Sequence, residues 1–323
     1  MNITKILALA VIIFTSAIVW AYDSVHGKVT VTVLDDSGSP VSGAKIRIGF
    51  KHLKDKLPGQ GWGVDVDYHP KEGLSDGSGM FSAADNTYPE IVVTVNKDDY
   101  YEGYDGVTFN DHNRDYQSKV ILKKKRNPGA MYAQRVEWIK IPAYDTPVGY
   151  DLEVGDWAAP YGKGKISDFV FKFTIKPHEI SYVLTFSNPQ DGIQEFQFDP
   201  EDHSSYRWPF EAPESDYLPT LMKNLKYVDG KMQTDLKSNG KINYIFRVRS
   251  IEGDKGQLAK ACYGKIIGEI DVATKGLVSF LYFFNPDGTR NLEFDYRKNL
   301  FLPPSINKNK RIYNKYRVND ISL

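Results

Sequence analysis

Residues 27–46 read Gly27-Lys-Val-Thr-Val-Thr-Val-Leu-Asp-Asp-Ser-Gly-Ser-Pro-Val-Ser-Gly-Ala-Lys-Ile46. Valine and threonine alternate over Lys28–Leu34, which predicts a strand with one buried face. The Asp-Ser-Gly-Ser-Pro segment then supplies turn residues, with Gly38 free to adopt a positive φ. A second strand is predicted over Ala44–Phe50. This strand–turn–strand opening favours an antiparallel β-sandwich.

The same period-2 pattern continues along the chain between Gly, Asn, Asp and Pro residues. It predicts further strands over 80–83, 91–96, 118–123, 136–141, 169–175, 182–187, 193–198, 244–249, 265–270, 278–284 and 292–294. Ser215–Leu225 begins with a Ser N-cap and predicts one short helix, which Pro219 limits. Many short strands with few helices predict an all-β protein of two antiparallel β-sandwich domains.

A cationic run at Lys123–Arg126 is followed by Asn-Pro-Gly, a combination that ends a strand and marks a domain boundary. We therefore divide the chain into a signal peptide at 1–21, a small β-sandwich at 24–126, a connector or first strand at 127–142, a larger β-sandwich at 143–302 and a basic tail at 303–323. Within the larger sandwich, Asn188–Gly192 and Asn285–Gly288 share turn chemistry and predict two β-hairpins. Common turn chemistry or an internal duplication would explain their likeness.

The composition is neutral and carries almost no cysteine. The 323 residues hold 41 Lys+Arg against 41 Asp+Glu, an apolar fraction of 41% and one cysteine. A neutral chain does not suit a nucleic-acid partner that is bound by neutralising its phosphates, and the apolar content excludes a disordered chain. The single Cys262 has no partner for an intramolecular disulfide, so we expect a buried, inert thiol.

The N-terminus has the pattern of a secretory signal. Lys5 precedes an apolar run over Ile6–Trp20, and Val19-Trp20-Ala21 offers a cleavage site after Ala21. This order is typical of a signal peptide, and an uncleaved membrane anchor is the alternative. No later apolar run is long enough to span a bilayer. The sequence therefore predicts a secreted or periplasmic protein with no transmembrane span after cleavage.

The opening strand and turn resemble the start of carboxypeptidase regulatory-like domains, which are prealbumin-like β-sandwiches related in shape to transthyretin and to starch-binding-like modules. Their second hallmark, Thr-Asp-x-x-Gly-x-Phe, is matched by Ser75-Asp-Gly-Ser-Gly-Met-Phe81, with Ser in place of Thr. A strand at Ile91–Asn96 followed by Tyr100-Tyr101 is similar to the third. The resemblance covers about residues 27–123 and implies an accessory, positioning or ligand-binding unit without catalytic residues. The rest of the chain resembles no family that we can name.

Aromatic side chains on predicted loops are the candidate ligand-binding residues. They occur in the insert Lys51–Leu74, in a turn near residue 160 and in the proline-stiffened, acidic loop Pro200–Pro219. Rigid loops that combine aromatic rings with polar groups are typical of ligand sites, saccharide sites among them. The alternative is that the aromatics fold back and pack on the sandwich. The candidates are Trp62, Trp157, Tyr161, Tyr206, Arg207 and Trp208.

Metal and nucleophile chemistry receive less support. Asp65, Asp67 and His69 alternate on a predicted strand, so they share one face and could ligate Ca²⁺ or a transition metal. The alternative is the solvated face of an edge strand, and we expect no cofactor. Ser75 fits Gly-x-Ser-x-Gly, but that motif needs a helix after the serine. A β-strand is predicted there instead, so we predict no nucleophile.

Three functional hypotheses follow. The leading one is a secreted or periplasmic, non-enzymatic binding or accessory protein that engages carbohydrate or cell-envelope material through loop aromatics. The first alternative is an extracellular hydrolase with an accessory domain that uses carboxylates such as Glu195, Asp199, Glu201 and Glu214. The second is a structural envelope or appendage subunit whose edge strands pair with other chains.

Overall fold

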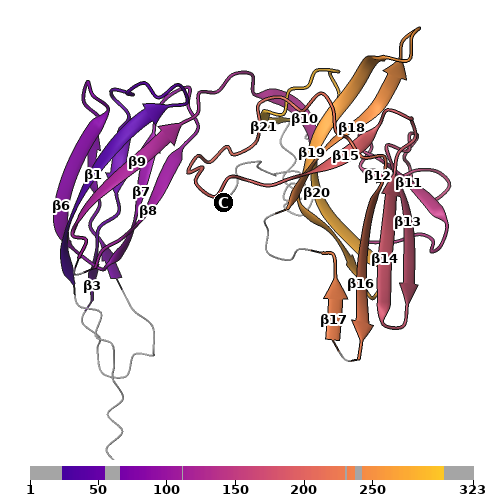
Figure 1. The fold of residues 1–323 in the computed structure, drawn as a ribbon, viewed down its shortest axis with the longest axis horizontal. Helices are drawn as coiled ribbons and strands as arrows, with labels where there is room; N and C mark the ends of the chain where they lie inside the picture. The colour runs from indigo at the N-terminus through magenta and orange to yellow at the C-terminus, as the bar shows by residue number, and fades with distance from the viewer. Residues whose placement is uncertain (1–23, 55–65, 111, 230, 237–241, 302–323) are drawn as a thin grey trace, which may run out of the picture.

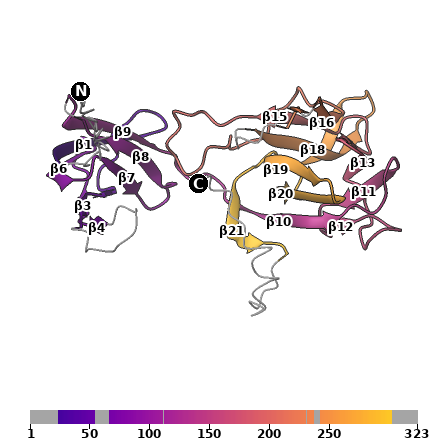
Figure 2. The ribbon, with the colours of Figure 1, turned by 90° about the horizontal axis from the view of Figure 1, so that it is seen from below.

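The computed structural model describes residues 24–54, 66–110, 112–229, 231–236 and 242–301. The predicted signal peptide, the basic tail, Trp62 and Asp65 lie outside these residues. All regular elements of the described residues are β-strands, so the all-β prediction is confirmed. Figures 1 and 2 show two bodies, which we call the N-terminal sandwich (β1–β9) and the C-terminal sandwich (β10–β21).

The N-terminal sandwich has a three-stranded sheet, β6-β1-β9, facing a four-stranded sheet, β5-β2-β7-β8, and a short β3-β4 ribbon. Its strands are β1 (Val25–Asp35), β2 (Lys45–Ile48), β3 (Lys51–Leu53), β4 (Val66–Tyr68), β5 (Lys71–Leu74), β6 (Met80–Thr87), β7 (Glu90–Asn96), β8 (Gly103–Thr108) and β9 (Asp115–Leu122). The alternation predicted for β1 is confirmed, because Val29, Val31 and Val33 are fully buried between the sheets. β1 pairs antiparallel with β6 and parallel with β9.

The opening turn depends on two glycines with positive φ. Gly38 has φ 82° at the turn that follows β1, which is the role predicted for it. Gly79 has φ 78°, and its carbonyl accepts a hydrogen bond from Val33 N at 2.8 Å. A Cβ at Gly79 would lie 2.5 Å from the Val33 carbonyl oxygen, so no larger side chain fits there without a shift of the backbone.

The C-terminal sandwich packs the six-stranded sheet β15-β18-β19-β20-β10-β21 against the six-stranded sheet β12-β11-β13-β14-β16-β17. Its strands are β10 (Gly129–Lys140), β11 (Pro147–Asp151), β12 (Asp156–Trp157), β13 (Phe169–Lys176), β14 (Glu179–Thr185), β15 (Gly192–Phe196), β16 (Leu221–Val228), β17 (Lys231–Thr234), β18 (Asn243–Glu252), β19 (Leu258–Ala273), β20 (Leu277–Asn285) and β21 (Phe294–Asn299). Aromatic rings fill the space between the sheets. Phe169, Phe171 and Phe173 are fully buried there, because alternate residues of the strand predicted over 169–175 point to the same face.

Two local predictions are wrong. Ser215–Leu225 forms no helix; it is irregular chain followed by β16, which pairs with both β14 and β17. The two Asn-Pro segments do not close hairpins, because β15 pairs with β18 of the other sheet and β21 pairs in parallel with β10. In these two segments, the Asp191 carboxylate accepts a hydrogen bond from Ser250 N, and the Asn285 amide donates one to Asn291 O. The side chains thus stabilise a change of direction, which turn chemistry alone does not distinguish from a hairpin.

Candidate ligand-binding cleft

The loop before β16 joins the two sandwiches. In Figure 1 it extends from the C-terminal sandwich toward the N-terminal one. There Tyr104 N donates to His203 O at 2.9 Å, and Ser205 N donates to Glu102 O at 2.7 Å. The loop therefore pairs with the start of β8 through an isolated antiparallel bridge between Gly103 and Ser204. This backbone pairing fixes how the chain segments of the two sandwiches meet.

Side chains reinforce this contact between the loop at 202–205 and the N-terminal sandwich, which we call the seam. His203 Nδ1 lies 3.3 Å from an Asp105 carboxylate oxygen, and Ser118 donates to the other oxygen at 2.7 Å. Lys123, at the end of β9, forms an ion pair with Asp202 of the loop. Because Asp105 is buried, the hydrogen bond from Ser118 and the nearby His203 ring offset part of the cost of removing the carboxylate from water.

Glu293 connects the seam to the chain segment that leads into β10. Its side chain is fully buried and accepts hydrogen bonds from Tyr101 Oη at 3.0 Å, Arg126 N at 3.0 Å and Asn127 N at 2.5 Å. One carboxylate thereby holds the N-terminal sandwich, the connecting segment and the start of β21 together. The segment 127–142, expected as a connector or first strand, contains β10 over Gly129–Lys140.

The aromatic loop residues pack in this seam. Tyr206 is fully buried and stacks on Tyr101 with ring centroids 4.5 Å apart, and Trp208 is 1% exposed and stacks on Phe196. The buried Lys265 ammonium lies 5.3 Å from the Tyr206 ring and 5.0 Å from the Trp208 ring. Neither ring therefore offers an open stacking face: Tyr206 packs across the contact between the sandwiches, and Trp208 packs against Phe196 of the C-terminal sandwich.

Arg207 and Trp157 also have internal partners. The Arg207 guanidinium lies 4.4 Å from the Phe198 ring centre. Trp157 is 5% exposed and donates from Nε1 to Lys140 O, so its ring offers no open stacking face either. Tyr161, by contrast, is 44% exposed. Of the predicted aromatic ligands that the structure describes, Tyr161 alone presents an accessible ring.

A cleft of about 290 Å³ opens beside the seam, between the N-terminal sandwich and β21. An adjoining hollow of about 650 Å³ continues the cleft, since Asn96, Tyr100 and Lys125 line both. Tyr296 of β21 presents a 48% exposed ring to the cleft. Domain boundaries are common places for ligand sites, because both walls contribute groups.

Charged groups of both signs line the cleft and the adjoining hollow in equal number. The cations are Lys45, Lys97, Lys125 and Arg297, and the carboxylates are Asp98, Asp99, Glu102 and Asp295. Several are fixed in place: Arg297 donates to Asp295 at 3.0 and 3.1 Å, and Asn96 donates to Glu102 at 3.0 Å. Burial alone would raise the pKa of Asp295, but the hydrogen bonds and charge of Arg297 lower it overall. The formal charges of the lining therefore balance, and the lining suits a ligand without net charge.

The sequence did not single out Tyr296 or Arg297, although Tyr100-Tyr101 entered as part of the family resemblance. The signal was an aromatic residue next to a cation on an exposed strand face, in Asp295-Tyr296-Arg297. That pattern is common on strands that bind nothing. The cleft depends on β21 lying beside the N-terminal sandwich, so the local sequence does not contain it.

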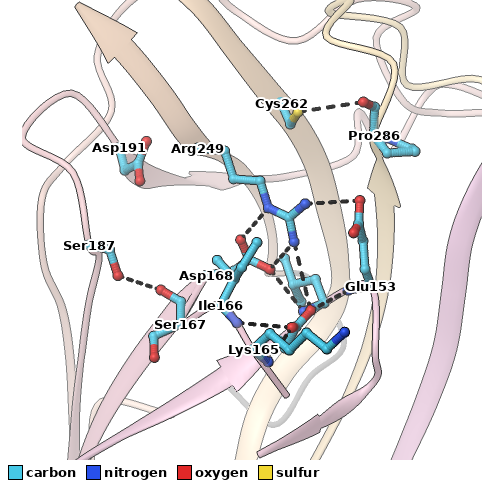
Figure 3. A network of polar contacts seen from close by, with 12 residues as sticks. Glu153, Lys165, Ile166, Ser167, Asp168, Ser187, Asp191, Arg249, Cys262 and Pro286 are labelled. Atoms are coloured by element: carbon cyan, nitrogen blue, oxygen red, sulfur yellow. Dashed lines mark hydrogen bonds and ion pairs between the residues drawn. The ribbon is translucent and has the colours of Figure 1, made fainter. Parts of the chain in front are cut away.

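Figure 3 shows a second polar network, at the end of the C-terminal sandwich. Arg249 donates to the fully buried Asp168 carboxylate at 2.7 and 2.9 Å and contacts Glu153 at 2.9 Å. Burial raises the pKa of Asp168 despite this pairing. Cys262 lies nearby, 6% exposed, with its Sγ 3.7 Å from Pro286 O. The expectation of a buried cysteine is confirmed, and burial raises the pKa of the thiol, which disfavours the reactive thiolate.

The weaker candidates have structural partners. Asp67 forms an ion pair with Lys54 at 2.9 Å, and the His69 ring stacks on His52 at 4.1 Å. Among the described residues, no three His, Cys, Asp or Glu side chains are arranged to hold a metal ion. The Ser75 hydroxyl donates to Val41 O and accepts Ala44 N, which ties the opening turn to β5.

The proposed hydrolase carboxylates have different surroundings. Glu195 accepts a hydrogen bond from the buried Lys223 at 2.9 Å. Glu214 is exposed and lies 3.1 Å from Arg290. Asp199 and Glu201 line a separate hollow against β9. These positions give no common geometry for an acid and a base acting on one bond.

Comparisons with known proteins leave the family open. No family model matches the chain, and no curated protein matches it in sequence. Among solved structures, the shaft pilin SpaA of Lactobacillus rhamnosus GG is 10% identical, covers 74% of this chain and 93% of its own, and has a TM-score of 0.22. The major pilin SpaD of Corynebacterium diphtheriae is 12% identical over 83% of this chain and 84% of its own, with a TM-score of 0.23.

A Bacteroides uniformis protein provisionally described as carbohydrate-binding is 12% identical over 79% of this chain and 95% of its own, with a TM-score of 0.16. Likenesses of this size say nothing about what the present chain does. In the part of the chain that the structure describes, we find no helix with the length and apolarity that crossing a bilayer requires.

Proposed function

We propose that the chain is a secreted or periplasmic, non-enzymatic binding protein that holds an uncharged saccharide in the cleft between its two sandwiches. The division into domains at about 24–126 and 143–302, the signal peptide and the relation to carboxypeptidase regulatory-like domains are parts of this proposal. The observation that carries it is the cleft wall, where the exposed Tyr296 ring adjoins fixed polar groups of balanced charge.

The chemistry of a saccharide matches this wall. A sugar ring has an apolar face of C–H groups that stacks on an aromatic ring, and hydroxyl groups that both donate and accept hydrogen bonds. Arg297 and Lys125 are donors, whereas Asp295 and Glu102 are acceptors. An ion of either sign would meet as many like charges as opposite ones. Neutral, polyhydroxylated ligands are therefore favoured over nucleic acid or phosphate.

Tyr296→Ala tests the proposal. One face of a tyrosine ring is about a third of the ~200 Å² that such a side chain buries, which at ~25 cal/mol per Å² is worth about 1.5 kcal/mol. We expect roughly tenfold weaker binding of the recognised sugar among cellotetraose, xylotetraose, mannotetraose and chitotetraose, measured by titration calorimetry. Tyr227→Ala is the matched control, since Tyr227 is 47% exposed on β16, outside the cleft. Equal effects of the two substitutions would refute the cleft as the site.

A second candidate is a structural subunit that assembles through strand edges. It is favoured by the hairpin β16–β17 at the end of one six-stranded sheet, where Met222, Tyr227 and Val228 are exposed. Light scattering at increasing protein concentration separates the two ideas. Growth of the particle mass with concentration supports assembly, and a constant monomer mass argues against it.

A further inference from the structure

A second hollow lies at the other end of β10. It encloses about 340 Å³, and its lining includes Ile139, Lys140, Asp156, Trp157 and Tyr161. The Tyr161 ring is 44% exposed, close to the 48% of Tyr296 in the cleft. Lys140 and Asp156 contribute one charge of each sign, so this lining is also balanced. The two hollows therefore share an accessible tyrosine, fixed polar groups and no net charge.

The loop that carries Tyr161 is held rigidly by Asp151. The buried Asp151 carboxylate accepts hydrogen bonds from Glu153 N at 3.0 Å, Val154 N at 3.1 Å, Lys165 N at 2.8 Å and Ile166 N at 3.0 Å. These bonds join both ends of the loop to one side chain. A ring on a pre-organised loop loses little conformational entropy when it binds, which favours a binding role over a mobile surface residue.

Strain in β10 lies directly beside this hollow. The register between β10 and β20 shifts between Val136 and Ile139, and Trp138 within that bulge has φ 45° and is 50% exposed. A positive φ is costly for a bulky aromatic residue, and bulges commonly redirect side chains next to functional sites. The bulge places Ile139 and Lys140 in the wall of the hollow, whereas the backbone before it keeps a regular register.

β10 also sets the spacing of the two hollows. Pro128, next to the start of β10, lines the cleft, and Ile139 near its end lines the second hollow. Eleven residues of strand at ~3.3 Å each span about 35 Å. We propose that the hollow around Tyr161 is a second saccharide site, so that the two ends of β10 bind separate segments of one extended, neutral polysaccharide. This inference rests on the proposed function of the cleft.

The test counts sites and then measures avidity. Calorimetric titration of the wild-type chain with the same four tetrasaccharides is expected to give two bound molecules per chain for the recognised sugar. Tyr161→Ala and Tyr296→Ala each leave one molecule bound with the wild-type affinity and weaken the other about tenfold, and Tyr161→Phe, which keeps the ring, leaves two. On the matching insoluble polymer (cellulose, xylan, mannan or chitin), each Ala variant is expected to bind at least tenfold more weakly than wild type, because linked sites act together. Tyr227→Ala, with an equally exposed ring elsewhere, leaves both measurements unchanged.

The outcomes separate the two proposals. One bound tetrasaccharide in wild type, lost in Tyr296→Ala and kept in Tyr161→Ala, overturns the second site and leaves the cleft. One bound molecule that is lost only in Tyr161→Ala overturns the cleft as the site. Absence of binding by wild type to all four sugars and polymers overturns both. Circular dichroism of each variant verifies that the fold is intact.

Discussion

Asp168→Asn should strongly destabilise the C-terminal sandwich. The Asp168 side chain is fully buried. It accepts two hydrogen bonds from Arg249 and one from Leu152 N at 2.9 Å. Asparagine keeps the shape and one acceptor, but it turns an N–H group toward the guanidinium, which has only donors. The substitution therefore breaks a buried ion pair while leaving the cation in place.

The expected magnitude follows from the surroundings of Arg249. Removing one partner of a buried ion pair typically costs about 3–5 kcal/mol. Arg249 keeps Glu153 at 2.9 Å, and its side chain is 20% exposed, so water and a second carboxylate compensate in part. Burial also raises the pKa of Asp168, which means that its charge is itself costly in the folded state. Both effects place the loss near the lower end, about 3 kcal/mol.

Urea unfolding followed by circular dichroism measures this loss. With a slope of about 3 kcal/mol per molar urea, a loss of about 3 kcal/mol lowers the midpoint by roughly 1 M. Asp191→Asn is the matched control, because Asp191 is also buried but its partners are Ser250 N and Asn188 Nδ2, with no cation. The Asn188 amide can rotate to restore its bond, so we expect a loss below about 1 kcal/mol. Equal midpoint shifts in the two variants would refute the reasoning.

Two further predictions concern the chain around the sites. Burial alone would raise the pKa of Asp151, but four hydrogen bonds from backbone N–H groups outweigh burial and lower the pKa. The stabilising effect of the carboxylate is therefore present above the unfolded pKa of about 3.8, and it is lost as pH falls through the lower folded pKa. The difference in unfolding free energy between wild type and Asp151→Asn should shrink as pH falls below about 4, and a pH-independent difference would contradict this account. Gly79→Ala should lower the free energy of unfolding by at least about 1 kcal/mol in thermal unfolding, because Gly79 has φ 78° and an added Cβ would meet the Val33 carbonyl oxygen of β1. Gly77→Ala is the control, since a Cβ there meets open space, and it should change stability by less. The reverse order would contradict the steric argument.

The fold class could be predicted because strand periodicity is local. Alternating Val and Thr in 27–46 fixed which face of β1 is buried, and Phe169, Phe171 and Phe173 did the same for β13. Pairing between distant strands could not be predicted in this way. β1 pairs in parallel with β9 and β10 with β21, and these partners lie about 90 and 165 residues later in the chain, so no turn residue specifies them.

The burial of the loop aromatics has the same origin. Aromatic residues on a proline-rich loop suit stacking, which favours Tyr206 and Trp208 as ligand-binding residues, but the loop meets β8 and these rings are covered by Tyr101 and Phe196. Trp157 is covered in the same way, whereas Tyr161 in the same turn stays exposed. Residue type states what a side chain is able to bind, but its burial depends on segments far away in sequence.

The sequence by itself determined an all-β chain with an N-terminal strand–turn–strand pattern, a cysteine without a disulfide partner in the chain and balanced charge, because each of these depends on local periodicity or on composition. Only the tertiary structure decided which aromatics are accessible, that Glu293 and the loop at 202–205 join the sandwiches, and that Tyr296 faces a cleft. The physical reason is that a cleft and a buried ring are made by surfaces brought together from distant parts of the chain. Periodicity reports on one strand at a time and contains no information about the strand that will cover it.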